Sequence, residues 1–138
     1  MIFPNKTSYA DLQPFVFFDE YTLTNTYVAG KVASFDEHNM VGLEITYTKG
    51  SETTFNLMIQ SSADGGNTYG QQVAIASSGG TTTVTKNEYA FTAASYATTD
   101  TITIIITPIK GDHLKLFAKY AGGSHPGSIS IRGMFGWV

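Results

Sequence analysis

The side chains that could do acid–base or metal chemistry are eleven carboxylates and three histidines. A glycosidase needs two carboxylates that face each other across a groove, and Glu44, on the polar face of an expected strand, could be paired with Glu88 or Asp112. Nothing in the spacing selects such a pair. The segment FDEHN at 35–39 offers oxygens and an imidazole, but the histidines form no H-x-H or H-E-x-x-H ligand pattern. No G-x-S-x-G nucleophile elbow is present either, so we expect a protein that is not an enzyme and that holds no metal or cofactor.

The stretch SSADGGNTYG at 61–70 is the most unusual local sequence. It matches S-x-D-x-G-x-T-aromatic and so resembles the Asp box of sialidase propellers and other β proteins. The resemblance implies a structural hairpin turn, in which Asp and Ser hydrogen-bond the turn backbone, glycine supplies an unusual φ, and the aromatic packs on the hairpin base. The expected turn residues are Ser62, Asp64, Gly66, Thr68 and Tyr69. A Ca²⁺ or ligand loop is the alternative, although clusters of Asp, Asn and Gly make turns by default.

Composition restricts the classes of partner. The chain has 138 residues, a net charge of −3, only 14% charged residues and no cysteine. Eight scattered Lys and Arg make no basic surface for phosphate, so we expect no nucleic acid. The longest apolar runs fall well short of the roughly 20 residues of a membrane helix, so we expect no membrane span.

Alternation of apolar and polar residues with a period of two predicts an all-β chain. Turn clusters separate the expected strands, and the Gly50-Ser51 pair indicates a tight hairpin between the second and third of them. Short strands at this spacing are typical of an antiparallel β-sandwich, and about eight of them in one domain favour a jelly roll. The expected strands are 21–28, 41–49, 53–60, 72–76, 81–91, 101–108, 113–120 and 128–135.

The first 19 residues differ from the rest, because they contain two prolines and several aromatics without alternation. We therefore expect an irregular N-terminal arm at 1–19 and a β-sandwich domain at 20–138. An arm that carries Phe3, Phe15 and Phe17 is too apolar to remain in water. It is expected to lie against this domain or a neighbouring subunit.

The segment LEITYTKGSETTFNLMIQSSADGGNTYG resembles the strand–turn–strand stretch of small β-sandwich proteins in tailed-phage virions. A later stretch, HLKLFAKYAGGSHPGSISI, is similar to the closing strands of those proteins. The resemblance covers roughly residues 20–135. It implies a virion structural protein, assembled in the host cytoplasm, such as a head decoration (cement) protein or a tail or adaptor component. A decoration protein would bind the major capsid protein and neighbouring copies of itself, for which a trimer is one candidate arrangement.

Three residues of the domain are candidate interface anchors on chemical grounds. Ile105 and Phe117 interrupt the polar faces of their strands, and an apolar side chain among polar neighbours can anchor a contact, although single exposed apolar residues are also common. Trp137 lies at the end of the chain, where residues fray unless they are docked. With Phe3, Phe15 and Phe17 of the arm, these complete the expected interface.

A carbohydrate-binding β-sandwich module is the alternative of another class. Such modules present aromatic side chains to a glycan on one sheet face or in end loops. The tyrosines that could supply this platform are Tyr47, Tyr69, Tyr89 and Tyr96.

Overall fold

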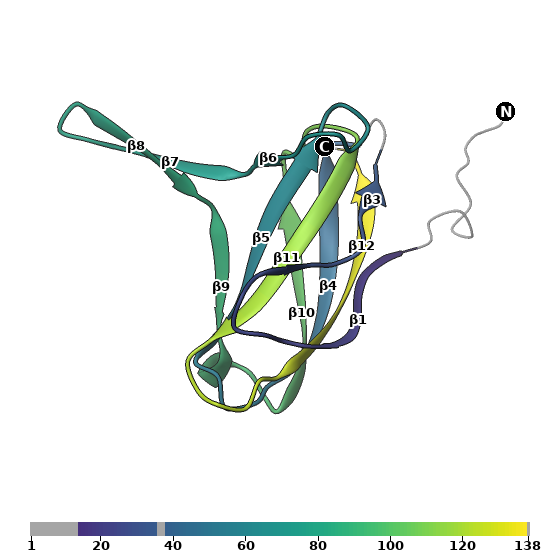
Figure 1. Ribbon diagram of the computed structural model, residues 1–138, viewed down its shortest axis with the longest axis vertical. Coiled ribbons are helices and arrows are strands. Elements are labelled where there is room, and N and C mark those ends of the chain that lie inside the picture. The colour runs from purple at the N-terminus through teal and green to yellow at the C-terminus, as the bar shows by residue number, and fades with distance from the viewer. Residues whose placement is uncertain (1–13, 36–37, 138) are drawn as a thin grey trace, which may run out of the picture.

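Two antiparallel sheets pack face to face in this computed structural model, which describes residues 14–35 and 38–137 (Figure 1). A separate two-stranded ribbon extends away from them. The four-stranded sheet has the spatial order β1 (Phe15–Thr22), β12 (Ser128–Gly136), β4 (Met40–Thr48) and β10 (Thr99–Ile106). The six-stranded sheet has the order β2 (Val28–Ala29), β11 (His113–Ala121), β5 (Thr54–Ser62) and β6 (Gly70–Gln71). Two further strands complete it: β3 (Ala33–Ser34) also pairs with β11, and β9 (Glu88–Thr92) also pairs with β5. The ribbon consists of β7 (Val73–Ser78) and β8 (Thr81–Lys86).

The connectivity is that of a jelly roll, as the sequence predicts. From β9 onward the chain passes from one sheet to the other at every connection, so that β10 and β12 join the four-stranded sheet and β11 lies in the other. Each sheet therefore interleaves strands from both halves of the chain. A single 3₁₀ turn, Ala93–Ser95, interrupts the strands between β9 and β10.

The core lies between the two sheets because alternate residues of the central strands point inward. On β4, Val41, Leu43, Ile45 and Tyr47 are fully buried. Leucines 114 and 116 of β11 face them from the opposite sheet and are equally buried. The strands predicted at 41–49, 53–60, 101–108, 113–120 and 128–135 correspond to β4, β5, β10, β11 and β12 within a few residues.

The start of the domain corrects the prediction of an irregular arm through residue 19. Strand β1 begins at Phe15 and pairs with β12. Its register shifts twice, between Val16 and Phe18 and again between Phe18 and Tyr21. The adjacent residues Phe17 and Phe18 of this irregular strand are both buried in the core, which a period-two pattern cannot show. The predicted strand at 21–28 is also wrong, since β1 ends at Thr22 and β2 begins only at Val28.

The connection after β4 is not the tight hairpin that Gly50-Ser51 predicts. Strands β4 and β5 belong to different sheets, so residues 49–53 cross the end of the sandwich. Glu52 points inward there and is only 5% exposed. Its carboxylate accepts the Tyr47 hydroxyl at 2.5 Å and the backbone N–H groups of Gly50 and Gly127 at 3.0 Å each. A buried carboxylate thus fastens two end loops to the core.

Candidate functional site

The predicted turn after β5 forms as a closed hydrogen-bonded unit. The Asp64 carboxylate accepts the Thr68 backbone N–H at 2.9 Å, the Thr68 hydroxyl at 2.7 Å and the Asn67 N–H at 3.1 Å. The buried Ser62 hydroxyl donates to the same carboxylate at 2.7 Å and accepts the Gly66 N–H at 2.9 Å. Gly66 has φ +93°, a left-handed conformation that favours glycine. As the sequence motif predicts, the side chains of Ser62 and Asp64 hydrogen-bond the turn backbone, and Gly66 supplies the unusual φ.

The hydrogen bonds leave the Asp64 carboxylate engaged with its own turn rather than with a ligand. They lower its pKa from 3.8 to about 2, and the largest contribution comes from the Thr68 backbone N–H. Tyr69 lies beneath the ammonium of Lys115, 3.9 Å from its ring centroid. Within the described residues, no group of three or more His, Asp or Glu is arranged to hold a metal ion.

The carboxylates that sequence reasoning considered for glycoside hydrolysis lie apart. Glu44 projects from the outer face of β4 and pairs with Arg132 of β12. Glu88 lies on β9 in the other sheet and accepts the Tyr27 hydroxyl. Asp112 caps the Asp64 turn, where it accepts the Gly65 N–H at 3.1 Å and contacts His113 at 2.8 Å. No two of these three face each other across a groove.

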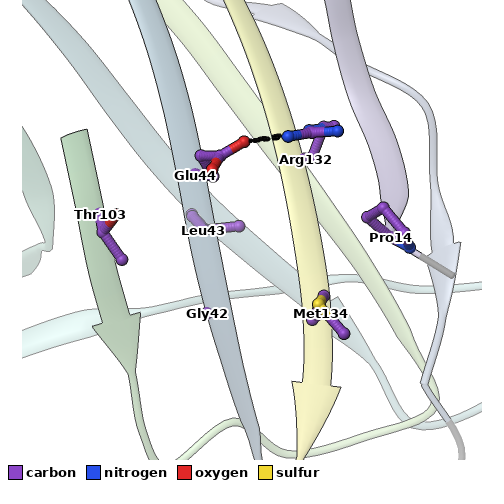
Figure 2. A pocket seen from close by; sticks show the side chains of 7 residues that line it. All are labelled: Pro14, Gly42, Leu43, Glu44, Thr103, Arg132 and Met134. Carbon is purple, nitrogen blue, oxygen red and sulfur yellow. Dashed lines mark hydrogen bonds and ion pairs between the residues drawn. The ribbon is translucent and has the colours of Figure 1, made fainter. Parts of the chain in front are cut away.

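A shallow depression of about 300 Å³ lies on the outer face of the four-stranded sheet (Figure 2). Gly42 forms its floor, since a methyl group there would meet nothing within 4 Å. Met134, Thr103 and Pro14 border it, and the Glu44–Arg132 ion pair closes one side. In the ladders that flank β4, Gly42 lies between Ile105 and Met134, which are 65% and 44% exposed. The depression is therefore a largely apolar hollow in a sheet surface, and the ionisable groups at its side, Glu44 and Arg132, are paired with each other.

The candidate interface residues of the domain differ in their exposure. Ile105 is 65% exposed, as the alternation along its strand predicts. Trp137 is 66% exposed, and its ring centroid lies 4.3 Å from that of His38. Phe117 is half-buried on the outer face of β11, with Met58 and Ala29 as its cross-strand neighbours.

The described arm residues of the predicted interface are buried or half-buried in this domain. Phe17 is 1% exposed and belongs to the core, so its assignment to an interface is wrong, because β1 begins earlier than the alternation indicates. Phe15 is half-buried and packs edge-on against Phe17 at 4.9 Å between ring centroids. Phe3 lies outside the described residues.

The four tyrosines of the carbohydrate hypothesis form no shared platform. Tyr47 is fully buried and hydrogen-bonded to Glu52. Tyr96 packs edge-on against Tyr47 at 6.1 Å. Tyr89 donates its hydroxyl to Gln72 at 3.0 Å, and Tyr69 is half-buried in the turn beneath Lys115. Tyr47 is therefore unavailable to a glycan.

The β7–β8 hairpin is the largest feature that sequence reasoning missed. The predicted strand 72–76 corresponds to β7, whereas the predicted strand 81–91 divides at Asn87 into β8, which pairs with β7, and β9, which pairs with β5. Every residue of β7 and β8 is exposed. Figure 1 shows the ribbon projecting from the sandwich, and no other strand in the described part of the chain lies against either of its faces. The sequence signal is the small size of its alanine, serine and threonine side chains, which cannot cover a core on either face.

Three apolar side chains lie on one face of this hairpin. Cross-strand partners share a face in an antiparallel ribbon, so the pair Ile75 and Val84 lies beside Val73. These three side chains are 69%, 58% and 43% exposed. The segment 73–86 contains one charged residue, Lys86. Lys86 lies opposite Val73 on this same face, at the base of the hairpin, so Ile75 and Val84 form its uncharged apolar part. Apolar side chains that are exposed together in this way are typical of a contact surface.

The base of the hairpin is fastened to the sandwich. Gln72 donates its N–H to the Ile59 carbonyl at 3.1 Å, and the Asn87 N–H donates to the Gln72 carbonyl at 3.0 Å. The Gln72 side-chain oxygen accepts the Tyr89 hydroxyl at 3.0 Å and the Asn87 side-chain amide at 3.3 Å. At the tip, Gly79 and Gly80 both have positive φ, as a two-residue hairpin turn of type I′ requires. The direction in which the ribbon leaves the sandwich is therefore fixed at its base.

No protein-family model matches the chain, and a search of curated proteins gave no significant match. Among the described residues, no helix has the length and hydropathy to cross a membrane.

Proposed function

We propose that this chain is a non-enzymatic structural protein of a tailed-phage virion, a head decoration protein that binds the major capsid protein and neighbouring copies of itself. Its place of action is the virion, assembled in the host cytoplasm. The resemblance of the segments around residues 43–70 and 113–131 to small virion β-sandwich proteins supplies the biological setting. The jelly-roll fold is compatible with this setting, and the projecting hairpin supplies the contact.

The observation that carries the proposal is the full exposure of β7 and β8. A two-stranded hairpin without a further strand or a helix against it is only marginally stable in water. This hairpin nevertheless presents Ile75 and Val84 to solvent on a base that fixes its direction. Burial of these two side chains against another subunit would remove the exposed apolar surface and stabilise the ribbon at the same time.

The contact rests on apolar burial and backbone pairing rather than on charge. Lys86 is the single charged residue of the hairpin, and apolar burial is not screened by salt whereas ion pairs are. Attachment to capsids is therefore expected to survive high ionic strength.

Co-sedimentation with capsids, purified from the virus whose genome carries this sequence, tests the proposal. In the test variant, an Asn-Gly pair replaces residues 73–86. Gln72 and Asn87 are already hydrogen-bonded to each other, so a two-residue turn can join them without strain. This variant is expected to keep its circular dichroism spectrum and melting behaviour but to stay in the supernatant.

Paired substitutions provide the matched control. Ile75→Asp with Val84→Asp places two charges on the apolar face of the hairpin, and Thr83→Asp with Thr85→Asp places the same charges on the opposite face. Only the first pair is expected to abolish sedimentation. Full-length protein that ignores capsids but binds an immobilised glycan would overturn the proposal in favour of a carbohydrate-binding module. Binding to purified tails and not to heads would assign it to a tail or adaptor position.

A further inference from the structure

We propose that the free edge of β10 pairs antiparallel with β10 of a second copy, which joins two four-stranded sheets into one continuous sheet. This inference does not depend on the virion assignment, because it rests on a different surface from the hairpin. A homodimer without capsid binding, or capsid binding by a monomer, would separate the two proposals.

Strand β10 is the one long and regular edge of the described sandwich. It pairs with β4 over eight consecutive residues without a register shift, and no strand of the described residues pairs with its other side. The opposite edge of the same sheet, β1, is irregular at two places. The edges of the second sheet are two-residue strands and the five-residue β9. Natural sheets protect their edges with bulges, short strands, prolines or charged side chains, lysine above all. Strand β10 (TDTITIII) has one of these, the charged Asp100 near its start.

The inner face of β10 is incompletely covered. On the neighbouring strand, Leu43 and Ile45 are fully buried. Their cross-strand partners on β10, Ile104 and Ile102, remain partly exposed at the margin of the core. A further strand at this edge would cover both isoleucines, and the free N–H and C=O groups of β10 would gain partners.

A second copy fits this edge in a definite register. Residues opposite each other in an antiparallel pair point to the same face. The two-fold axis between the two copies of β10 must therefore lie midway between the two copies of one residue, which are directly opposite each other. An axis at Thr103 places Ile102 of each copy opposite Ile104 of the other on the inner face. On the outer face it places Thr101 opposite Ile105. The partly exposed Ile102 and Ile104 of each copy would then be covered by the same residues of the other copy.

The charges of the edge also favour a second copy over a charged partner strand. Asp100 is the sole charge of β10, and its carboxylate is already engaged by the N–H groups of Ala97 at 3.2 Å and Thr101 at 3.1 Å. In the proposed register each Asp100 lies opposite Ile106, so the two carboxylates are separated by about six residues, or roughly 20 Å along the ladder. Like charges therefore do not meet, and nothing on the edge attracts a strand rich in lysine or arginine.

Single-cysteine cross-linking tests the register, because the chain contains no cysteine of its own. Thr103→Cys places two thiols opposite each other at the axis, within the Cα separation that a disulfide spans. Mild oxidation of this variant is expected to give a covalent dimer at high yield. Thr46→Cys is the matched control, since Thr46 is exposed on the same face but lies one strand inward, on β4. Its symmetry mate would be three strand spacings away across the sheet, roughly 14 Å, and four residues away along the strands, roughly 13 Å, so no dimer is expected.

Sedimentation equilibrium of the full chain tests the association itself. The wild-type protein is expected to show a species of twice the 14.9 kDa monomer mass. Thr103→Lys places like charges directly opposite each other and should shift the protein to monomer, whereas Thr46→Lys adds the same charge and should leave the dimer intact. The proposal is overturned by a wild-type protein that is monomeric up to its solubility limit. It is equally overturned by a dimer that Thr103→Cys does not cross-link, or that both lysine variants dissociate alike.

Discussion

Removal of the buried carboxylate of Glu52 should destabilise the whole sandwich. The side chain is 5% exposed and accepts hydrogen bonds from the Tyr47 hydroxyl and from the N–H groups of Gly50 and Gly127. Burial, together with the hydrogen bond to Glu52 and its negative charge, raises the pKa of the Tyr47 phenol, so this hydroxyl stays protonated and acts as the donor. The substitution Glu52→Ala would remove the acceptor for all three groups.

The magnitude follows from which donors lose access to water. Tyr47 and Gly127 are buried, whereas Gly50 is exposed and can bind solvent instead. A buried group left unsatisfied costs about 1–3 kcal/mol, so two of them amount to about 2–6 kcal/mol for Glu52→Ala. Glu52→Gln should cost only about 1 kcal/mol, because the amide oxygen still accepts both N–H groups and the amide nitrogen can donate to the Tyr47 oxygen.

Urea unfolding followed by tryptophan fluorescence and circular dichroism measures these differences. A double-mutant cycle of Glu52→Ala with Tyr47→Phe should show a coupling of about 1–2 kcal/mol, since the second change removes the hydroxyl that the first leaves without an acceptor. The reasoning would be refuted if Glu52→Ala and Glu52→Gln were equally stable, or if the two substitutions in the cycle were additive.

Three further predictions concern the turn, a glycine and the chain start. Because the pKa of Asp64 is lowered to about 2, its contribution is complete above the ordinary value of 3.8 and is lost as the pH falls toward 2. The melting temperature of wild type should therefore exceed that of Asp64→Asn at pH 6, and the gap should close on acidification. Gly127→Ala should lower the denaturation midpoint sharply, since its methyl would lie 2.4 Å from the Thr48 carbonyl oxygen, whereas Gly42→Ala should be neutral or slightly stabilising. Deletion of residues 1–13 should leave a cooperative melting transition, but deletion of 1–18 should abolish it, because Phe17 and Phe18 belong to the core.

Much of the sandwich could be predicted from local pattern. Strands with strict alternation, such as β4 and β11, were predicted within a few residues because one face is buried and the other is not. The Asp64 turn was predictable as well, since the hydrogen bonds of the Ser62 and Asp64 side chains join residues at most four positions apart. The exposure of Ile105 follows from the same alternation.

Other features depend on contacts between segments far apart in the sequence. The bulges of β1 bury two adjacent phenylalanines, so no periodic pattern marks the strand. Glu52 is buried because the loop that contains Gly127, 75 residues later, supplies an N–H donor. Neither contact leaves a local signature in the sequence.

The division of 81–91 into β8 and β9 shows most clearly what only the tertiary structure decided. Both strands have the same β-forming composition, but β9 adds to the sandwich beside β5 while β8 leaves it beside β7. Composition determined that this stretch is extended, because threonine and valine favour strands in any sheet. Which neighbour each half pairs with depends on the space available beside β5. Phe91 fills that space by stacking on Phe55 at 4.4 Å, and the small side chains of β8 leave no comparable core to bury. Local pattern thus determined where the regular strands form, and the packing between the sheets determined which of them remained exposed.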